Sequence, residues 1–261
     1  MKEQYVGDIN DYRKYALLRA LAEGGVTRIG VCWMLTPPDG RPDGNKVSYL
    51  NQPQYERFDS ALFALLKRVK DTPNTRRLVL IEESGIIPDA TYVNTMVPDK
   101  LFERQIWFSE ALKSLHRSDL IFFDPDNGLE VSSKRKGQLN SSKYLYRDEV
   151  AATYQAGHSI LIYQHFPREE RRAFIERIST DLHGLAPNSQ VWVFQTSHVA
   201  FFLLIHPHHE QTLSSASLDI AANHHSQFLM GECPSVEPNT SRDAPLQRSL
   251  SPIETTALQD N

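Results

Sequence analysis

The sequence is poor in cysteine and has no long apolar run. Its 261 residues include only two cysteines, Cys32 and Cys233. Two thiols so far apart are typical of a reducing compartment, so we expect a cytoplasmic protein. They exclude a disulfide framework and a zinc site built from cysteines alone within one chain. No apolar run approaches the roughly 18 residues that a membrane span needs, so we expect no membrane partner.

The charge is nearly balanced, with a formal net charge of −4 and an isoelectric point near 6.2. This balance does not by itself indicate a nucleic-acid-binding protein, but it leaves room for a local basic groove. The first residues, "MKEQYVGDINDYRKY", are charged where a signal peptide would be apolar. We therefore expect no export signal.

The hydrophobic content, 40%, suffices for one sizeable core. We expect a single α/β domain over residues 1–206 and a C-terminal extension over residues 207–233, with one last helix or a pair of short strands around residues 213–228. The remainder, residues 234–261, is rich in Ser, Thr, Pro and Asn and predicts a disordered tail.

Helical and strand patterns alternate along the domain. The helices are expected at residues 11–23, 58–70, 101–115, 142–156 and 168–182. The strands are expected at residues 28–35, 76–83, 119–124, 159–166, 190–197 and 198–207. This alternation predicts an open, doubly wound, mostly parallel sheet that ends in an antiparallel hairpin. Ligands of such sheets bind at the carboxyl ends of the strands.

Two carboxylates, an amide and a proline follow one of the apolar runs. The run at residues 120–123 leads into Asp124, Pro125, Asp126 and Asn127. A plain turn accounts for the proline and for the asparagine, but it needs no carboxylate at the last position of a strand. We therefore interpret these four residues as catalytic candidates.

The segment "GDINDYRKYALL" precedes the first expected strand. A capped helix start accounts for its acidic residues. It does not account for Asn10 and Lys14, so we take Asn10, Asp11 and Lys14 as candidate site residues. Glu82 and Glu83, placed after the expected strand at residues 76–83, are further candidates, since an acid at that point can hold a ribose.

Two further segments border the expected crevice. "YQHFPREERR" places Gln164, His165 and Arg168 after a strand, where His165 could be a base, a metal ligand or a hydrogen-bonding wall. "NSSKYLYRDE" contains Lys143 and Tyr144. A basic residue beside tyrosines suits a phosphate backbone and a stacked base, although a solvated loop is the simpler interpretation. His165 is thus a catalytic candidate, and Gln164, Arg168, Lys143 and Tyr144 are substrate-binding candidates.

The order of "GDINDYRKYALL", "FFDPDNGL", "ILIYQHFPR" and a terminal hairpin resembles the class I S-adenosylmethionine-dependent methyltransferases. More narrowly, it is similar to bacterial rRNA adenine-N6 methyltransferases and, in layout, to three-Cys-motif partner proteins. The resemblance covers residues 7–206 and implies a Rossmann-like sandwich. It also implies that Gly7, Asn10 or Asp11, and Lys14 lie beside the cofactor and the target base, which makes Asn10, Asp11 and Lys14 cofactor-binding candidates. Asp124 and Pro125 match the strand end that receives an exocyclic amine in the family.

The chain departs from that pattern at two places. Asp126 and Asn127 stand where the family has a second proline and an aromatic residue. The first strand runs into "WMLTPPDGRPDG" rather than into a regular glycine-rich loop.

Three functions remain open from the sequence. The first is methyl transfer from S-adenosylmethionine to an amino group of a nucleic-acid base. The second is a Mg²⁺-dependent nuclease or phosphoesterase with Asp124, Asp126 and Glu130 as ligands, joined by Asp8 or Asp11. The third is a fold relative that binds a nucleotide or a partner without chemistry.

Overall fold

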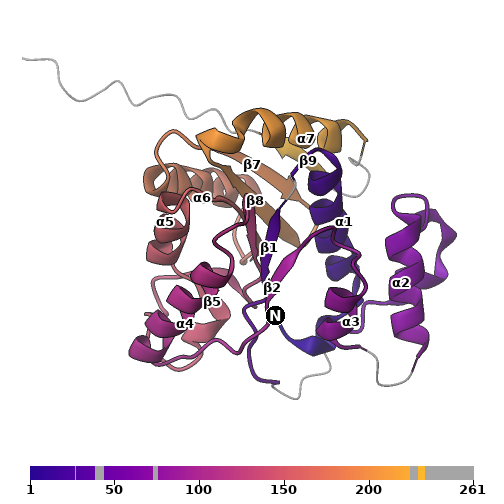
Figure 1. Cartoon of the computed structure of the whole chain (residues 1–261), viewed down its shortest axis with the longest axis horizontal. Coiled ribbons are helices and arrows are strands. Elements are labelled where there is room, and N and C mark those ends of the chain that lie inside the picture. Colours follow the sequence, from indigo (N-terminus) through magenta and orange to yellow (C-terminus); the bar gives the residue numbers. More distant parts are fainter. Residues whose placement is uncertain (27, 39–43, 73–75, 224–228, 233–261) are drawn as a thin grey trace, which may run out of the picture.

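The computed structural model describes residues 1–26, 28–38, 44–72, 76–223 and 229–232 (Figure 1). In this part of the chain a seven-stranded sheet has the order β2-β1-β3-β6-β8-β7-β9. Four neighbouring strands run parallel: β2 (Thr91–Val93), β1 (Ile29–Cys32), β3 (Leu120–Phe123) and β6 (Ser159–His165). The other three, β8 (Val199–Ile205), β7 (Gln190–Gln195) and β9 (Leu229–Glu232), pair antiparallel with their neighbours. The predicted α/β class, with parallel strands and a C-terminal hairpin, is confirmed.

Each face of the sheet has its own hydrophobic core. In β3, Leu120 and Phe122 belong to one core, whereas Ile121 and Phe123 belong to the other. Residues alternate between faces because successive side chains of a strand point in opposite directions. All four are buried, so the sequence shows a continuous apolar run rather than an alternation of apolar and polar residues.

Helices cover both faces, as a doubly wound sheet requires (Figure 1). One core is completed by α1 (Ile9–Glu23), α2 (Ser60–Asp71), α3 (Leu78–Glu83) and α7 (Glu210–Asn223). The other is completed by α4 (Leu101–Ser114), α5 (Arg147–Gln155) and α6 (Arg171–Leu185). Short 3₁₀ turns lie at Glu3–Tyr5, Ser48–Asn51, Pro53–Tyr55, Ser141–Lys143 and Pro207–His209.

The strand predicted at residues 76–83 is wrong. The run Leu78 to Ile81 lies in the short helix α3, which buries Leu78 and Ile81, three positions apart. A short apolar run cannot distinguish a strand from a buried helix by its pattern alone. The strand that follows this helix and pairs with β1 is β2, whose first two residues are exposed or half-buried. It therefore has no apolar run by which to recognise it.

The helix predicted from residue 142 begins later, at Arg147. Before it, β5 (Tyr144–Leu145) pairs with β4 (Gly128–Leu129), the segment that follows the Asp-Pro-Asp-Asn stretch. The Glu149 carboxylate accepts a hydrogen bond from the Tyr146 backbone N–H at 3.0 Å and so defines the helix start. The other predicted helices are confirmed, with their ends shifted by a few residues.

The C-terminal part of the described chain packs on the same core as α1. Leu213, Ala216 and Ile220 of α7 belong to the core that contains α1. The contact is close, because a Cβ added at Gly24 would lie 2.4 Å from the Ala216 Cβ. The predicted tail at residues 234–261 lies outside the described residues. None of the described helices is long and apolar enough to cross a membrane.

Candidate functional site

A cavity of about 530 Å³ opens where the parallel strands end. The chain passes from β1 to β2 on one side and then to β3 on the other side of β1, which makes the β1/β3 edge a topological switch point. Open α/β sheets bind their ligands in the crevice at such a point. The cavity is lined by Met1, Tyr5, Asp8, Asn10, Asp11, Lys14, Gly44, Asn45, Lys46, Asp124, Pro125, Asp126, Tyr163 and His165.

Lys14 joins the first helix to the end of β3. Its Nζ lies 2.8 Å from the Asp124 Oδ2 and 3.0 Å from the Asp11 Oδ1. Asp11 accepts a second hydrogen bond from the Tyr15 hydroxyl at 3.1 Å. The Asp8 carboxylate caps α1 by accepting from the Asn10 and Asp11 backbone N–H groups. The helix cap therefore fixes where Asp11 and Lys14 point, and Lys14 brings the two segments into contact.

Burial sets the protonation of this cluster. Burial raises the pKa of Asp11 to about 7; Lys14 opposes this, and the Asp8 and Asp124 charges add to it. Burial works against the charge on Lys14, but Asp11 and Asp124 outweigh it and raise the Lys14 pKa. Lys14 is therefore a fixed cation, and Asp11 is the carboxylate that exchanges a proton near neutral pH.

Asp126 forms a second ionic cluster in the same cavity. Its carboxylate lies 3.0 Å from the Met1 ammonium and 3.2 Å from the Lys2 Nζ, and it accepts from the Thr36 hydroxyl at 2.7 Å. Burial would raise its pKa, but the Met1 ammonium, Thr36 and Lys2 together lower it to about 2. The same ammonium donates to the Met34 and Asp124 carbonyls, both at 3.0 Å. Asp126 thus remains ionised and supports the residues around Asp124.

Asn10 contributes an unused acceptor. It is buried and lines the cavity, yet its Oδ1 has no hydrogen-bond partner within the described chain. A buried carbonyl oxygen without a partner is costly and calls for an explanation, such as a ligand that donates to it. Asn10 is therefore placed as a ligand-binding residue would be.

Tyr163 and His165 form the wall opposite α1. The Lys14 Nζ lies 4.2 Å from the centre of the Tyr163 ring, a cation–π contact. The Tyr163 hydroxyl lies 3.3 Å from the His165 Nε2. His165 is exposed at the cavity mouth, but partial desolvation and the Lys14 charge lower its pKa to about 4. His165 is therefore neutral at neutral pH and can serve as a hydrogen-bonding wall.

A second cavity of about 630 Å³ adjoins the first and also includes His165. Besides His165, three predicted residues line it: Asn127, Tyr144 and Gln164. The sequence placed Gln164 and His165 together at one strand end. In the structure Tyr163 lines the first cavity and Gln164 the second, whereas His165 lines both. Consecutive strand residues face opposite sides.

Four predicted residues line neither cavity. Glu82 is at the end of helix α3 rather than of a strand, and it accepts from the Trp33 Nε1 at 2.8 Å and the Asn94 Nδ2 at 3.0 Å. Its neighbour Glu83 is exposed, as is Arg168. Lys143 is half-buried, and its carbonyl accepts from the Asn127 N–H at 2.9 Å. The expectation that Glu82 and Glu83 follow a strand is wrong.

Several residues of the site were not predicted from the sequence. Tyr163 could have been found from the two-residue period of its strand, since it shares a face with His165. Met1, Lys2 and Thr36 gave no such signal, because only the fold brings them to Asp126. The loop expected to hold a cofactor after β1 includes residues 39–43, which lie outside the described residues. Gly44, at its end, lines the cavity.

The carboxylates proposed as magnesium ligands are already engaged. Asp124 pairs with Lys14, and Asp126 pairs with Met1 and Lys2. Glu130 lies elsewhere, where its carboxylate accepts from the Arg147 N–H at 2.8 Å. In the part of the chain that the structure describes, no group of three or more His, Cys, Asp or Glu is arranged to hold a metal ion.

Comparison with known proteins adds no assignment. No protein-family model matches the chain, and the search of curated proteins found no relative. The chemistry of the site must therefore be argued from its own residues.

Proposed function

We propose that the protein transfers a methyl group from S-adenosylmethionine to an exocyclic amino group of a nucleic-acid base. The observation that supports this best is the Lys14 ammonium between Asp11 and Asp124, under a cavity at the switch point of the sheet. This contact unites the two segments on which the resemblance to class I methyltransferases rests. On this proposal the α/β sheet with its terminal hairpin is a methyltransferase-type sandwich, and the distant cysteines favour action in the cytoplasm.

The residues of the first cavity suit the cofactor. Its volume lies within the range of about 300–1,000 Å³ typical of small-molecule sites. S-adenosylmethionine supplies an electrophilic methyl group on a positively charged sulfonium. The Asp11 carboxylate suits that charge, and the unpartnered Asn10 Oδ1 suits the ammonium of the methionine part. Lys46, also in the lining, suits its carboxylate.

Asp124 then has the role of orienting the acceptor amine. Its carboxylate accepts a hydrogen bond from the N–H of the amine and leaves the nitrogen lone pair free to form the new N–C bond. That nitrogen must afterwards release one proton. Asp11, with its pKa near 7 and linked to Asp124 through Lys14, is the group placed to receive it.

The test is thermal stability with S-adenosylmethionine and with its demethylated product, S-adenosylhomocysteine. A ligand that binds only the folded state raises the melting temperature by mass action. At a ligand concentration 100 times Kd, it adds about 2.7 kcal/mol to the free energy of unfolding. We expect a saturable rise with both compounds. The absence of a rise with either at millimolar concentration contradicts the proposal and leaves a fold relative without this cofactor.

Labelled methyl transfer to single-stranded RNA and DNA then tests the chemistry. Asp124→Ala, which removes the acceptor oxygens, should retain the thermal shift but lose transfer by roughly 100-fold or more. Asp119→Ala is the matched control, because Asp119 lies just before β3, at the opposite end of the same strand, and pairs with Arg28. Equal loss in both variants would mean that the effect is structural.

A further inference from the structure

The second cavity is separated from the first only by the ends of β3 and β6. Along the chain after β3, Asp126 lines the first cavity and Asn127 the second. Along β6, Tyr163 lines the first and Gln164 the second, and His165 lines both. The two cavities therefore flank the same strand ends and share His165.

The floor of the second cavity is rigidly built. The buried Gln164 side chain accepts from the Leu129 N–H at 2.7 Å and donates to the Asn127 carbonyl at 3.3 Å and the His165 carbonyl at 2.6 Å. This amide lies directly over Gly128, where an added Cβ would be 2.3 Å from the Gln164 Oε1. Gly128 is thus required for the amide to reach the backbone on both sides of it.

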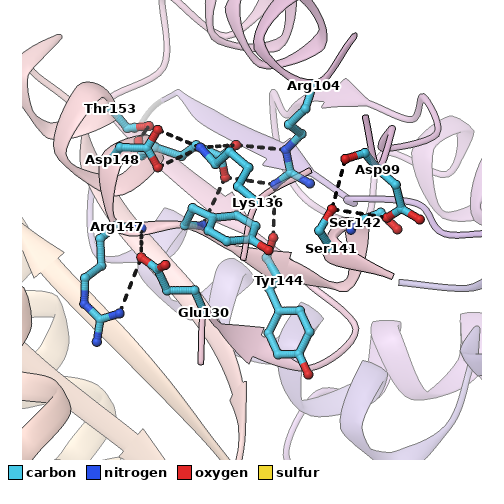
Figure 2. Close-up of polar contacts among 12 residues, drawn as sticks. Asp99, Arg104, Glu130, Lys136, Ser141, Ser142, Tyr144, Arg147, Asp148 and Thr153 are labelled. Atoms are coloured by element: carbon cyan, nitrogen blue, oxygen red, sulfur yellow. Dashed lines mark hydrogen bonds and ion pairs between the residues drawn. The ribbon is translucent and has the colours of Figure 1, made fainter. Parts of the chain in front are cut away.

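One wall is the strand β5, and Tyr144 stands on it. Arg104 anchors this strand by donating a hydrogen bond to the Tyr144 carbonyl at 3.0 Å. The Arg104 guanidinium is buried and paired in two places with Glu149, at 2.8 Å each. Figure 2 shows the Tyr144 ring extending away from this polar cluster. Because the buried pair fixes the backbone, the ring is presented from a rigid base.

The rest of the lining combines aromatic and charged groups. Phe166 and Phe174 contribute rings, with Phe174 almost fully buried. The lining also contains Arg147, paired with Asp181 at 2.8 Å and with Glu130 at 3.4 Å, and Arg177, paired with Glu169 at 2.5 Å; Glu130 and Glu169 line the cavity too, so a phosphate would compete with them for the two guanidinium groups. Aromatic faces next to guanidinium groups are the combination with which proteins bind single-stranded nucleic acid, by stacking the bases and contacting the phosphates.

We propose that the second cavity binds the acceptor, a base of a single-stranded nucleic acid that stacks on the Tyr144 ring with its flanking phosphates near Arg177 and Arg147. This inference rests on the proposed function, since it assigns the acceptor side of the same site. Asn127, exposed at the boundary between the cavities, then contacts the base edge nearest Asp124. Tyr144 and Arg177 are binding residues and need no part in the chemistry.

The experiment is equilibrium binding of a fluorescently labelled single-stranded oligonucleotide of mixed sequence, as RNA and as DNA, measured by anisotropy. We expect Tyr144→Ala to weaken binding about 5- to 150-fold, and Tyr144→Phe to retain it. Arg177→Gln should weaken binding and reduce the slope of log affinity against log salt by about 0.7 per lost phosphate contact. Arg172→Gln is the matched control, because Arg172 is on the same helix, pairs with Glu176, and does not line the cavity.

Two results overturn the inference. One is tight binding that Tyr144→Ala leaves unchanged, and the other is failure of the wild-type protein to bind either oligonucleotide. A denaturation midpoint for Tyr144→Ala close to that of the wild type ensures that lost binding reports the cavity rather than unfolding.

The binding readout separates this inference from the proposed activity. Loss of binding in Tyr144→Ala without any cofactor-induced thermal shift supports the acceptor cavity and contradicts methyl transfer. A cofactor shift with methyl transfer that is equal in wild type and Tyr144→Ala supports the activity and overturns the acceptor cavity.

Discussion

The Lys14 Nζ lies 2.8 Å from the Asp124 Oδ2, although 110 residues separate the two in the chain. Both side chains are almost fully buried, with exposed fractions of 4% and 1%. Removing one partner of an ion pair at that depth is strongly destabilising, because it leaves the other charge buried and unpaired. The pair therefore fixes the first helix to the end of β3 and holds the cavity in shape.

Replacing Lys14 by Met should lower the free energy of unfolding by about 3–5 kcal/mol, because two buried carboxylates lose their shared cation. Urea denaturation at pH 7 measures the change. The double variant Lys14→Met/Asp124→Asn should recover part of the loss, since one of the stranded charges is then removed.

The control for this prediction is Lys100→Met. Lys100 pairs with Glu103 at 2.9 Å, but their side chains are 80% and 52% exposed. An exposed pair contributes at most about 1 kcal/mol. A loss in Lys14→Met no larger than in this control would show that the buried cluster is not held together by its charges.

The raised pKa of the Asp11 carboxyl predicts that stability falls as the pH rises. Its pKa is raised from 3.8 to about 7 in the folded protein, so between these values the folded state binds the proton more tightly than the unfolded chain. The free energy of unfolding should therefore fall as the pH rises from about 4 to about 7, by on the order of 4 kcal/mol from this group.

Asp11→Asn isolates that contribution. The pH dependence of the variant, subtracted from that of the wild type, should show the fall across this window, while the contributions of other groups cancel. His165 is one such group, and it acts with the opposite sign because its pKa is lowered to about 4. Parallel curves for the two proteins would place the Asp11 pKa at its ordinary value.

Gly128→Ala should destabilise the protein and disturb the floor of the second cavity. The new Cβ would lie 2.3 Å from the Gln164 Oε1, at a backbone φ of +107° that side chains rarely adopt. Gly157→Ala is the matched control, since Gly157 has a φ of +95° but nothing within 4 Å of an added Cβ.

The two glycine variants share the conformational penalty of roughly 1 kcal/mol, so their difference measures the clash. We expect Gly128→Ala to lose at least about 1 kcal/mol more than Gly157→Ala in urea denaturation. Gln164→Ala in the Gly128→Ala background should restore part of that excess. Equal losses would mean that Gln164 moves aside freely.

The buried pair of Arg104 and Glu149, neither of which lines the first cavity, predicts a large effect on stability. Arg104→Met leaves the buried Glu149 carboxylate without its main partner and should cost about 3–5 kcal/mol. Arg172→Met, in the exposed pair with Glu176, should cost at most about 1 kcal/mol. Chemical denaturation of both variants compares them, and similar values would contradict a structural role for the buried pair.

The sequence placed Asp124 at a strand end correctly but misplaced Glu82. Asp124 could be found because an acid directly after a buried strand has to face the crevice of a parallel sheet. Glu82 was misplaced because the short apolar run before it fits a strand and a helix equally well. In the structure this run forms the helix α3. The residues that pair with Asp126 were not predictable, because Met1, Lys2 and Thr36 come from two segments that are distant from it in the chain.

By itself, the sequence determined the α/β class and most of the helices and strands, because buried strands and amphipathic helices have different periods that local composition records. It also placed Asp124 and the end of β6 at the crevice. Only the tertiary structure decided which residues meet there: that Lys14 reaches Asp124, that Tyr163 rather than Gln164 faces them, and that Asn10 has an acceptor left over. The reason is physical, since contacts between distant segments depend on register and side-chain direction, which no local pattern specifies.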